Sequence, residues 1–164
     1  MGGDREFLEV ARRLREITRR LQTIFVVNDR VAAALLSKAD GVHLGQEDLP
    51  VKEVRSLVGR QMLIGRSTHS LTQAQAAERE GADYIGVGPI FSTPTKPETP
   101  AVGVELIRQV RQAIRIPWVA IGGIDLQTMP LVLSAGATRV AVVRAVAAAS
   151  DPEAAARSLK ERMG

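Results

Sequence analysis

Gly81-Ala-Asp-Tyr-Ile-Gly-Val-Gly-Pro-Ile-Phe91 is the stretch that decides the fold. Its first glycine ends a helix predicted over residues 71–80, an Ala-Asp turn follows, and Tyr84–Val87 forms an apolar strand. Related turns recur at Ala39-Asp-Gly41 and at Gly136-Ala-Thr138, each of them just before another short apolar run. The repetition predicts a series of units in which a helix is followed by a strand.

Helix and strand patterns alternate on both sides of this stretch. Strands are expected over Ile24–Val27, Gly41–Leu44, Met62–Gly65, Tyr84–Val87, Trp118–Ile121 and Val140–Val143, and helices near 4–21, 30–38, 50–58, 71–80, 103–114, 127–135 and 152–162. Apolar strands separated by helices indicate an α/β protein with a parallel sheet. A TIM (β/α)8 barrel has eight such strands and takes at least ~200 residues. We therefore expect residues 1–164 to form a single partial TIM-type barrel domain of about six strands, which lacks the first strand–helix–strand.

Composition restricts the class of protein. The chain has 164 residues, 45% of them hydrophobic and 24% charged, as in an ordinary globular protein. It contains no cysteine, which excludes disulfides and thiolate metal sites, and nothing in it indicates export. It has no apolar run long enough to span a bilayer. We therefore expect a cytoplasmic protein with no membrane partner.

The net charge of +4 raises the question of nucleic-acid binding. Six arginines between Arg5 and Arg20 alternate with an apolar stripe at helical spacing, which consists of Phe7, Val10, Leu14, Ile17 and Leu21. This pattern predicts a helix with a core side and a solvated side. Aromatic residues placed for base stacking are absent, so we expect no nucleic-acid partner, and the charge favours anionic metabolites instead.

The loop that follows strand Tyr84–Val87 carries anion-binding chemistry. In Gly86-Val-Gly-Pro-Ile-Phe-Ser-Thr-Pro-Thr-Lys96, three hydroxyls and a lysine leave one strand end together, on a backbone whose glycines allow close approach. A phosphate site and a long polar crossover loop are both compatible with this composition. A second glycine loop, Ile121-Gly-Gly-Ile124, follows strand Trp118–Ile121 and favours the functional interpretation.

Polar residues follow the carboxyl end of each predicted strand. They are Asn28–Asp29, Gln46–Asp48, Ser67–His69, Thr93–Lys96, Gly122–Gly123 and Val143–Arg144. Asp29 and Asp48 could cap the helices that follow them, and Ser67 could be a turn residue. His43 is expected to be a satisfied interior histidine, and His69 a loop histidine with no obvious partner. Taken together, however, two carboxylates on neighbouring strands suit Mg²⁺, which prefers phosphate oxygens for its remaining ligands.

The chain resembles the thiamine-phosphate synthase family from about residue 24 to its C-terminus. The matching segments are Val27–Arg30, Ala39–Asp48, Gly65–His69, Gly81–Phe91, Thr93–Lys96, Ile116–Ile124 and Val140–Val143. Arg66 and Arg144 are similar to the cyanobacterial branch of that family. The resemblance implies a transferase of thiamine biosynthesis, which joins hydroxymethylpyrimidine diphosphate to thiazole phosphate and releases diphosphate, with Mg²⁺ as cofactor.

The resemblance also implies roles for individual residues. Asp29 and Asp48 would bind Mg²⁺. Asn28, Ser67 and Lys96 would hold the pyrimidine diphosphate, with Lys96 and Ser67 as catalytic residues. Thr93, Pro94, Thr95, Gly123, Val143 and Arg144 would hold the thiazole phosphate. The metal and the lysine would stabilise the charge growing on the departing diphosphate, leaving a pyrimidine-methyl cation for the thiazole nitrogen to attack.

Two departures from the family pattern leave alternatives open. Arg144 replaces a small hydroxylic residue, and the family's first strand–helix–strand, with its Gln-x-Arg-x-Lys segment that grips the diphosphate, has no counterpart in residues 1–22. The chain could be a synthase that is intact in mechanism, or one completed by association, as a homo-oligomer or with another chain that restores the missing strands. It could also be a degenerate fragment that still binds phosphates. The related thiazole tautomerase is a third alternative, but the chain has Pro89 at the position of that family's catalytic histidine.

Overall fold

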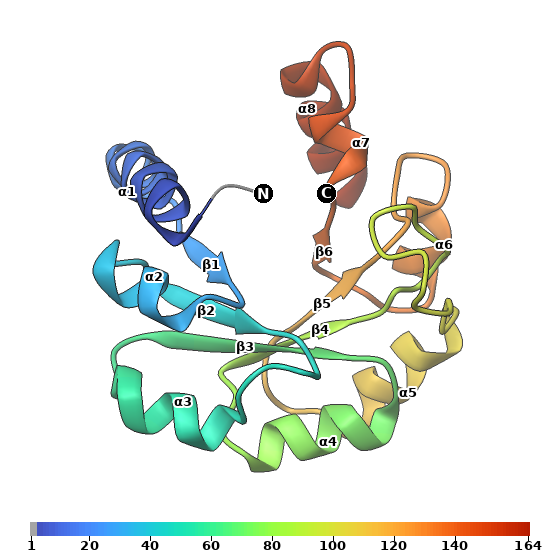
Figure 1. Ribbon diagram of the computed structural model, residues 1–164. Helices are drawn as coiled ribbons and strands as arrows, with labels where there is room; N and C mark the ends of the chain where they lie inside the picture. The colour runs from blue at the N-terminus through green and yellow to red at the C-terminus, as the bar shows by residue number, and fades with distance from the viewer. Residues whose placement is uncertain (1–2) are drawn as a thin grey trace.

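The computed structural model describes residues 3–164, so the first two residues of the predicted 1–164 unit lie outside it. These residues form a curved, six-stranded, all-parallel sheet in the order β1-β2-β3-β4-β5-β6 (Figure 1). The strands are β1 (Val26–Asn28), β2 (Gly41–Leu44), β3 (Leu63–Thr68), β4 (Tyr84–Val87), β5 (Trp118–Ile121) and β6 (Val140–Ala141). The α/β half-barrel expected from the sequence is confirmed.

Helices alternate with these strands along the chain. They are α1 (Asp4–Arg20), α2 (Val31–Leu36), α3 (Val51–Val58), α4 (Leu71–Arg79), α5 (Glu105–Ala113), α6 (Met129–Ser134), α7 (Arg144–Ala147) and α8 (Pro152–Met163). Figure 1 shows α2 to α6 along the outer face of the curved sheet. The sequence analysis missed α7, a four-residue helix that is separated from the end of β6 by Val142 and Val143.

The core lies between the outer face of the sheet and the helices. Val42 and Leu44 of β2, Ile64 of β3 and Ile85 of β4 are fully buried there. Each such side chain contributes about 1.5–3 kcal/mol by leaving water. Because side chains alternate along a strand, the residues between these positions face the inside of the half-barrel.

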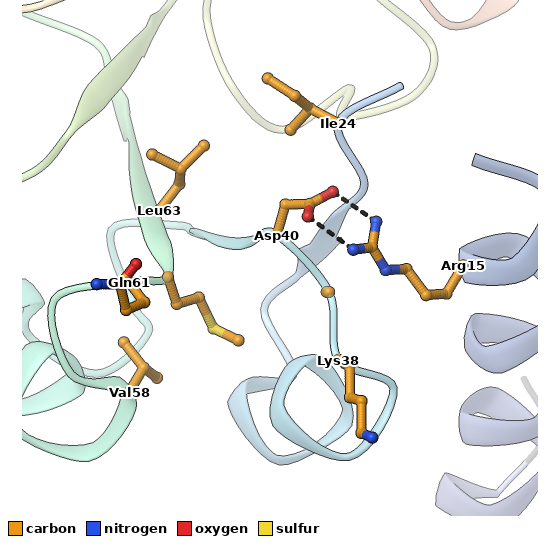
Figure 2. A pocket seen from close by; sticks show the side chains of 9 residues that line it. Arg15, Ile24, Lys38, Asp40, Val58, Gln61 and Leu63 are labelled. Atoms are coloured by element: carbon orange, nitrogen blue, oxygen red, sulfur yellow. Dashed lines mark hydrogen bonds and ion pairs between the residues drawn. The ribbon is translucent and has the colours of Figure 1, made fainter. Parts of the chain in front are cut away.

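An aspartate fixes the start of two strands at the turn predicted from the repeats. Asp40 Oδ2 accepts a hydrogen bond of 2.8 Å from Phe25 N–H, and both carboxylate oxygens pair with Arg15, at 2.7 and 2.9 Å (Figure 2). Asp83 Oδ2 does the same with Ile64 N–H at 2.7 Å and with Arg55 at 2.5 Å. We call these two arrangements the aspartate clamps. They hold neighbouring strands together at their amino ends.

A hollow of about 440 Å³ surrounds the first clamp, between Arg15, Ile24, Asp40 and Met62 (Figure 2). It lies at the amino ends of β1 to β3. Ligands of α/β sheets bind at the opposite, carboxyl end, where the candidate residues are found. The hollow is therefore separate from the candidate site.

Most of the core side predicted for α1 is exposed, which corrects the sequence analysis, although Phe7 is partly buried and packs against the core. Val10, Leu14, Ile17 and Leu21 are 50%, 44%, 53% and 69% exposed, and Ala11 is the one residue of α1 that is buried. The physical reason is that α1 packs on α2 beside β1, the edge strand, so that its apolar stripe has no strand beneath it. Figure 1 shows α1 and the α7–α8 pair on either side of this open part of the half-barrel.

No helix among residues 3–164 is both long enough and apolar enough to cross a lipid bilayer.

Candidate functional site

The candidate polar residues gather at the carboxyl edge of β1 to β4. Asn28 ends β1 and is paired in register with His43 of β2, and Ser67 of β3 is paired with Gly86 of β4. Asp29 follows β1 directly, and Asp48 lies in the loop between β2 and α3. Because all the strands are parallel, residues that follow them meet at one rim.

Asp29 adopts a backbone conformation that is uncommon for residues other than glycine. Its φ is +62°, in the left-handed region, and its N–H donates a 2.8 Å hydrogen bond to the carbonyl of His43. Asp and Asn tolerate this region better than most residues, which pay about 1 kcal/mol or more. Helix α2 has Arg30 at its N-cap and receives no side-chain cap. The alternative that Asp29 is a helix cap is therefore wrong.

Asp48 is also not a helix cap, because α3 starts after Pro50 and no side chain caps it. Instead, Asp48 Oδ2 accepts a 2.6 Å hydrogen bond from Gly45 N–H, which folds the loop after β2 back on itself. Arg66 of β3 supports the same loop by donating to the carbonyls of Gln46 at 3.2 Å and Leu49 at 3.1 Å. The sequence analysis did not assign this supporting role to Arg66.

The two carboxyl groups lie next to each other. Burial raises the pKa of Asp29, and the Asp48 carboxyl, close enough to share a hydrogen bond with it, raises this pKa further. The charges of Lys96 and Arg30 act in the opposite direction on the same pKa. Asp29 is exposed as a residue. Of the two causes that raise its pKa, burial and the Asp48 carboxyl, the second therefore says more about the site. Two carboxylates held this close repel each other when both are ionised, and a bound cation would offset that repulsion.

The donor set at this rim fits Mg²⁺. Within residues 3–164 there is no cluster of three or more histidine, cysteine or acidic side chains that could hold a metal, so a metal here has two protein carboxylates at most. Zinc sites need three or four protein ligands. Mg²⁺ is commonly held by one or two carboxylates, with water and phosphate oxygens completing its octahedron.

Ser67 lies inside β3, which extends to Thr68, so the alternative that Ser67 is a turn residue is wrong. Ser67 is 8% exposed, and its Oγ is 2.9 Å from His43 Nε2. His43 Nδ1 is in turn 3.0 Å from the hydroxyl of Tyr84 in β4. His43 is thus the satisfied interior histidine that was expected, while the contribution of Tyr84 was not anticipated.

Burial governs the ionisation of this pair. It lowers the pKa of His43 to about 4, and the positive charges of Lys96 and Arg66 act in the same direction. Burial also raises the pKa of Tyr84 to about 12. At neutral pH the imidazole is therefore neutral and the phenol keeps its proton.

The two glycine-containing loops pack directly on each other. Ile90 N–H donates to the carbonyl of Ile121 at 2.8 Å, and Phe91 N–H donates to the carbonyl of Gly122 at 3.1 Å. Gly123 has φ +65°, and a Cβ there would come within 2.7 Å of Phe91 Cβ and 2.9 Å of Ser92 O. Gly123 therefore lets the backbone of its loop pack closely against Phe91 and Ser92 of the other loop. The sequence analysis had inferred only that glycines here allow a ligand to approach.

Thr93, Pro94, Thr95 and Lys96 form a turn at the edge of this loop pair. Lys96 N–H donates to Thr93 O, and Thr95 N–H donates to Thr93 Oγ1, both at 3.3 Å. Lys96 is exposed, and its charge acts to lower the pKa of His43 and opposes the rise in the pKa of Asp29, so it lies near both groups. The turn thus lies on the same rim as the two carboxylates.

Helix α6, expected near 127–135, begins at Met129, so a turn separates Gly123 from the start of this helix. Asp125 closes the intervening turn by accepting from the N–H groups of Gln127 and Thr128, both at 2.9 Å, and these bonds lower its pKa. Within residues 3–164, the N–H groups of Gly123 and Ile124 have no backbone acceptor.

Val143 and Arg144 lie after β6, which ends at Ala141 rather than at Val143. Val143 is 63% exposed and precedes α7, of which Arg144 is the first residue. His69, for which the sequence suggested no partner, is hydrogen-bonded through Nδ1 to the carbonyl of Gly88. It therefore ties the end of β3 to the loop after β4.

The chain is similar to known proteins over almost all of its length. Residues 1–146 match the family model described as thiamine monophosphate synthase. A thiamine-phosphate synthase of Synechococcus sp. (strain WH7803) is 51% identical over 96% of this chain, and one of Chloroflexus aurantiacus is 51% identical over 95%. Among solved structures, thiamine phosphate pyrophosphorylase from Pyrococcus furiosus superposes with a TM-score of 0.93 and 37% identity.

Coverage of these relatives is less complete. The chain spans 45% of the Synechococcus relative, 72% of the Chloroflexus relative and 78% of the Pyrococcus chain. The similarity to cyanobacterial sequences expected from Arg66 and Arg144 is confirmed. By its sequence and its half-barrel, this chain belongs to the thiamine monophosphate synthase family.

Proposed function

We propose that this chain provides most of the active site of a thiamine-phosphate synthase, as one partial-barrel unit. The reaction joins hydroxymethylpyrimidine diphosphate to thiazole phosphate and releases diphosphate. The observation that carries this proposal is that Asp29, Asp48, Ser67 and Lys96, from four separate segments, gather at one rim of the sheet. A fold alone would not require this convergence.

Asp29 and Asp48 are proposed to hold Mg²⁺. Two observations support this proposal. Neither carboxylate caps a helix, and Arg66 holds the loop of Asp48 through hydrogen bonds to the carbonyls of Gln46 and Leu49. When bound, the ion would neutralise charge on the diphosphate and so make it a better leaving group.

Lys96, Ser67 and Asn28 are proposed to bind the pyrimidine diphosphate. Lys96 brings a positive charge near the carboxylates from an exposed turn outside the helices and strands. As the bond from the pyrimidine methylene to the diphosphate breaks, charge accumulates on the leaving oxygen, where a lysine and a hydroxyl donor stabilise it most. The carbocation left behind is attacked by the thiazole nitrogen.

The two packed loops are proposed to hold the thiazole phosphate. The Thr93–Thr95 hydroxyls and the N–H groups after Gly122 have the donors that a phosphate monoester requires. Val143 and Arg144 would complete this side from the segment after β6. The exposed position of both residues leaves room for Arg144 to add a charged contact to phosphate.

We propose that a further strand–helix–strand segment, from the same polypeptide or from a second one, closes the half-barrel. Two observations support it: α1 presents an exposed apolar stripe, and β1 and β6 are the edges of the sheet. The Pyrococcus structure extends beyond the matched region by 22% of its length, since 78% of it is covered. A strand–helix–strand unit of 30 or more residues fits such an extension.

The test is a synthesis assay with both substrates and Mg²⁺, run beside a mass measurement in solution. Formation of thiamine phosphate that is lost in Asp48→Asn supports the synthase. Calorimetry that detects thiazole phosphate binding without turnover supports a degenerate phosphate-binding fragment instead. Tautomerisation of the thiazole would support the tautomerase, although Pro89 packs against Gly122 and offers no group for proton transfer.

A further inference from the structure

A chain of hydrogen bonds crosses the inside of the half-barrel beneath the rim. It runs from the Tyr84 hydroxyl in β4 to His43 Nδ1 in β2 at 3.0 Å, and from His43 Nε2 to Ser67 Oγ in β3 at 2.9 Å. Tyr84 is the only tyrosine of the protein, and His43 is one of two histidines. Neither residue has a role in the function proposed above.

Glycines make room for this chain. Gly65 lies in register between His43 and Tyr84, and a Cβ at Gly65 would overlap both rings. Gly86 leaves the other side of the imidazole open, since a Cβ there would lie 3.4 Å from His43 Cε1. The two rings therefore meet across the middle strand of the three, with centroids 5.5 Å apart. The histidine is held from two sides and cannot turn without losing both hydrogen bonds.

The direction of the protons decides what Ser67 can do. A neutral imidazole has a single N–H, so two arrangements satisfy both hydroxyls. In one, Ser67 donates its proton to Nε2, and Nδ1–H donates to Tyr84; the serine proton is then occupied. In the other, Tyr84 donates to Nδ1 and Nε2–H donates to Ser67 Oγ, which leaves the serine proton directed toward the rim.

Phosphate oxygens accept hydrogen bonds and do not donate them. An anionic ligand can therefore bind to Ser67 Oγ–H only in the second arrangement, in which the serine proton is free. We propose that Tyr84 fixes His43 as the Nε2–H tautomer and thereby makes Ser67 a hydrogen-bond donor to the diphosphate. Tyr84 and His43 are positioning residues that act through Ser67. This inference rests on the proposed function for the identity of the ligand, but the tautomer itself does not depend on turnover.

The tautomer is measured by nitrogen-15 NMR of the imidazoles in the full chain at pH 7.5, with His69→Gln used to assign the two histidines. The Nε2–H form in the wild-type protein, replaced by an Nδ1–H form or a mixture in Tyr84→Phe, supports the proposal even if no thiamine phosphate is made. The Nδ1–H form in the wild-type protein overturns it even if synthesis is observed.

Binding of inorganic diphosphate with Mg²⁺, measured by calorimetry, tests the link to Ser67. Tyr84→Phe and Ser67→Ala are each expected to weaken binding about tenfold, the effect of losing one hydrogen bond to a charged group. In the double variant the tyrosine change is expected to add nothing to the serine change. Two independent, additive losses would show that Tyr84 acts through packing and would overturn the proposal.

Discussion

Replacement of Asp29 separates its effect on stability from its effect on metal binding. The pKa of Asp29 is raised in the folded state above its ordinary 3.8. The folded protein therefore holds this proton more tightly than the unfolded chain, so that ionised Asp29 lowers stability at neutral pH. Asp29→Asn removes the charge and keeps a residue that tolerates the φ of +62°. We expect it to melt at or above the wild-type temperature without Mg²⁺.

Asp29→Ala removes the same charge but leaves a residue unsuited to the left-handed region. That conformation costs alanine about 1 kcal/mol. For a chain of this size, 1 kcal/mol corresponds to about 2–4 °C in melting temperature. The alanine variant should therefore melt about 3 °C below the asparagine variant. Mg²⁺ at 100 times its dissociation constant should stabilise the wild-type protein by about 2.7 kcal/mol, or about 5–10 °C, and neither variant should respond.

Differential scanning calorimetry with and without Mg²⁺ measures both effects. Asp125→Asn is the matched control: hydrogen bonds from Thr128 and Gln127 lower the pKa of Asp125, so its loss should lower the melting temperature and preserve the Mg²⁺ response. The reasoning about Asp29 is refuted if Asp29→Asn melts well below the wild-type protein in the absence of metal, or if it retains the full Mg²⁺-induced shift.

Three further predictions concern neighbouring groups. Lys96→Ala should abolish synthesis and leave the melting temperature unchanged, because this side chain is exposed on a loop; undiminished turnover would remove Lys96 from the mechanism. Arg66→Gln should weaken Mg²⁺ binding, measured by calorimetry, about tenfold by freeing the carbonyls on either side of Asp48, whereas Arg60→Gln, on the exposed turn after α3, should not. The pKa of His43 falls from 6.5 to about 4 on folding, so stability should decrease by about 3 kcal/mol as pH falls from 6.5 to 4; denaturant titrations should show a smaller decrease in His43→Gln.

The sequence predicts the elements of this fold well where the pattern is regular. The strands Gly41–Leu44, Tyr84–Val87 and Trp118–Ile121 have the bounds that their apolar runs indicate. Ser70 caps α4 by accepting from Gln73 N–H at 3.2 Å, in the capping-box spacing of a serine three residues before a glutamine. Local rules suffice here, since neighbouring residues determine the outcome.

Prediction is poorer where the outcome depends on distant residues. The sequence suggests a polar loop at Arg66, Ser67 and Thr68, but these residues continue β3 because each polar side chain finds a partner on neighbouring segments. Ser67 pairs with His43 inside the half-barrel, Thr68 donates to the carbonyl of Gly86, and Arg66 donates to the loop after β2. The exposure of the α1 stripe depends on what lies beside β1, which the periodicity of α1 does not reveal. The Tyr84–His43–Ser67 chain likewise depends on strand register.

The aspartate clamps have a consequence for how this architecture can change. They fix the alignment of β1 with β2 and of β3 with β4 at the amino ends of these strands, through hydrogen bonds to backbone N–H groups and ion pairs with arginine. No residue of the rim takes part in these contacts. Rim segments can therefore be exchanged, lengthened or given new chemistry while the alignment of the strands persists. Chimaeras that carry the rim loops of another protein with this half-barrel should thus remain folded as long as the two aspartates and their arginines are retained.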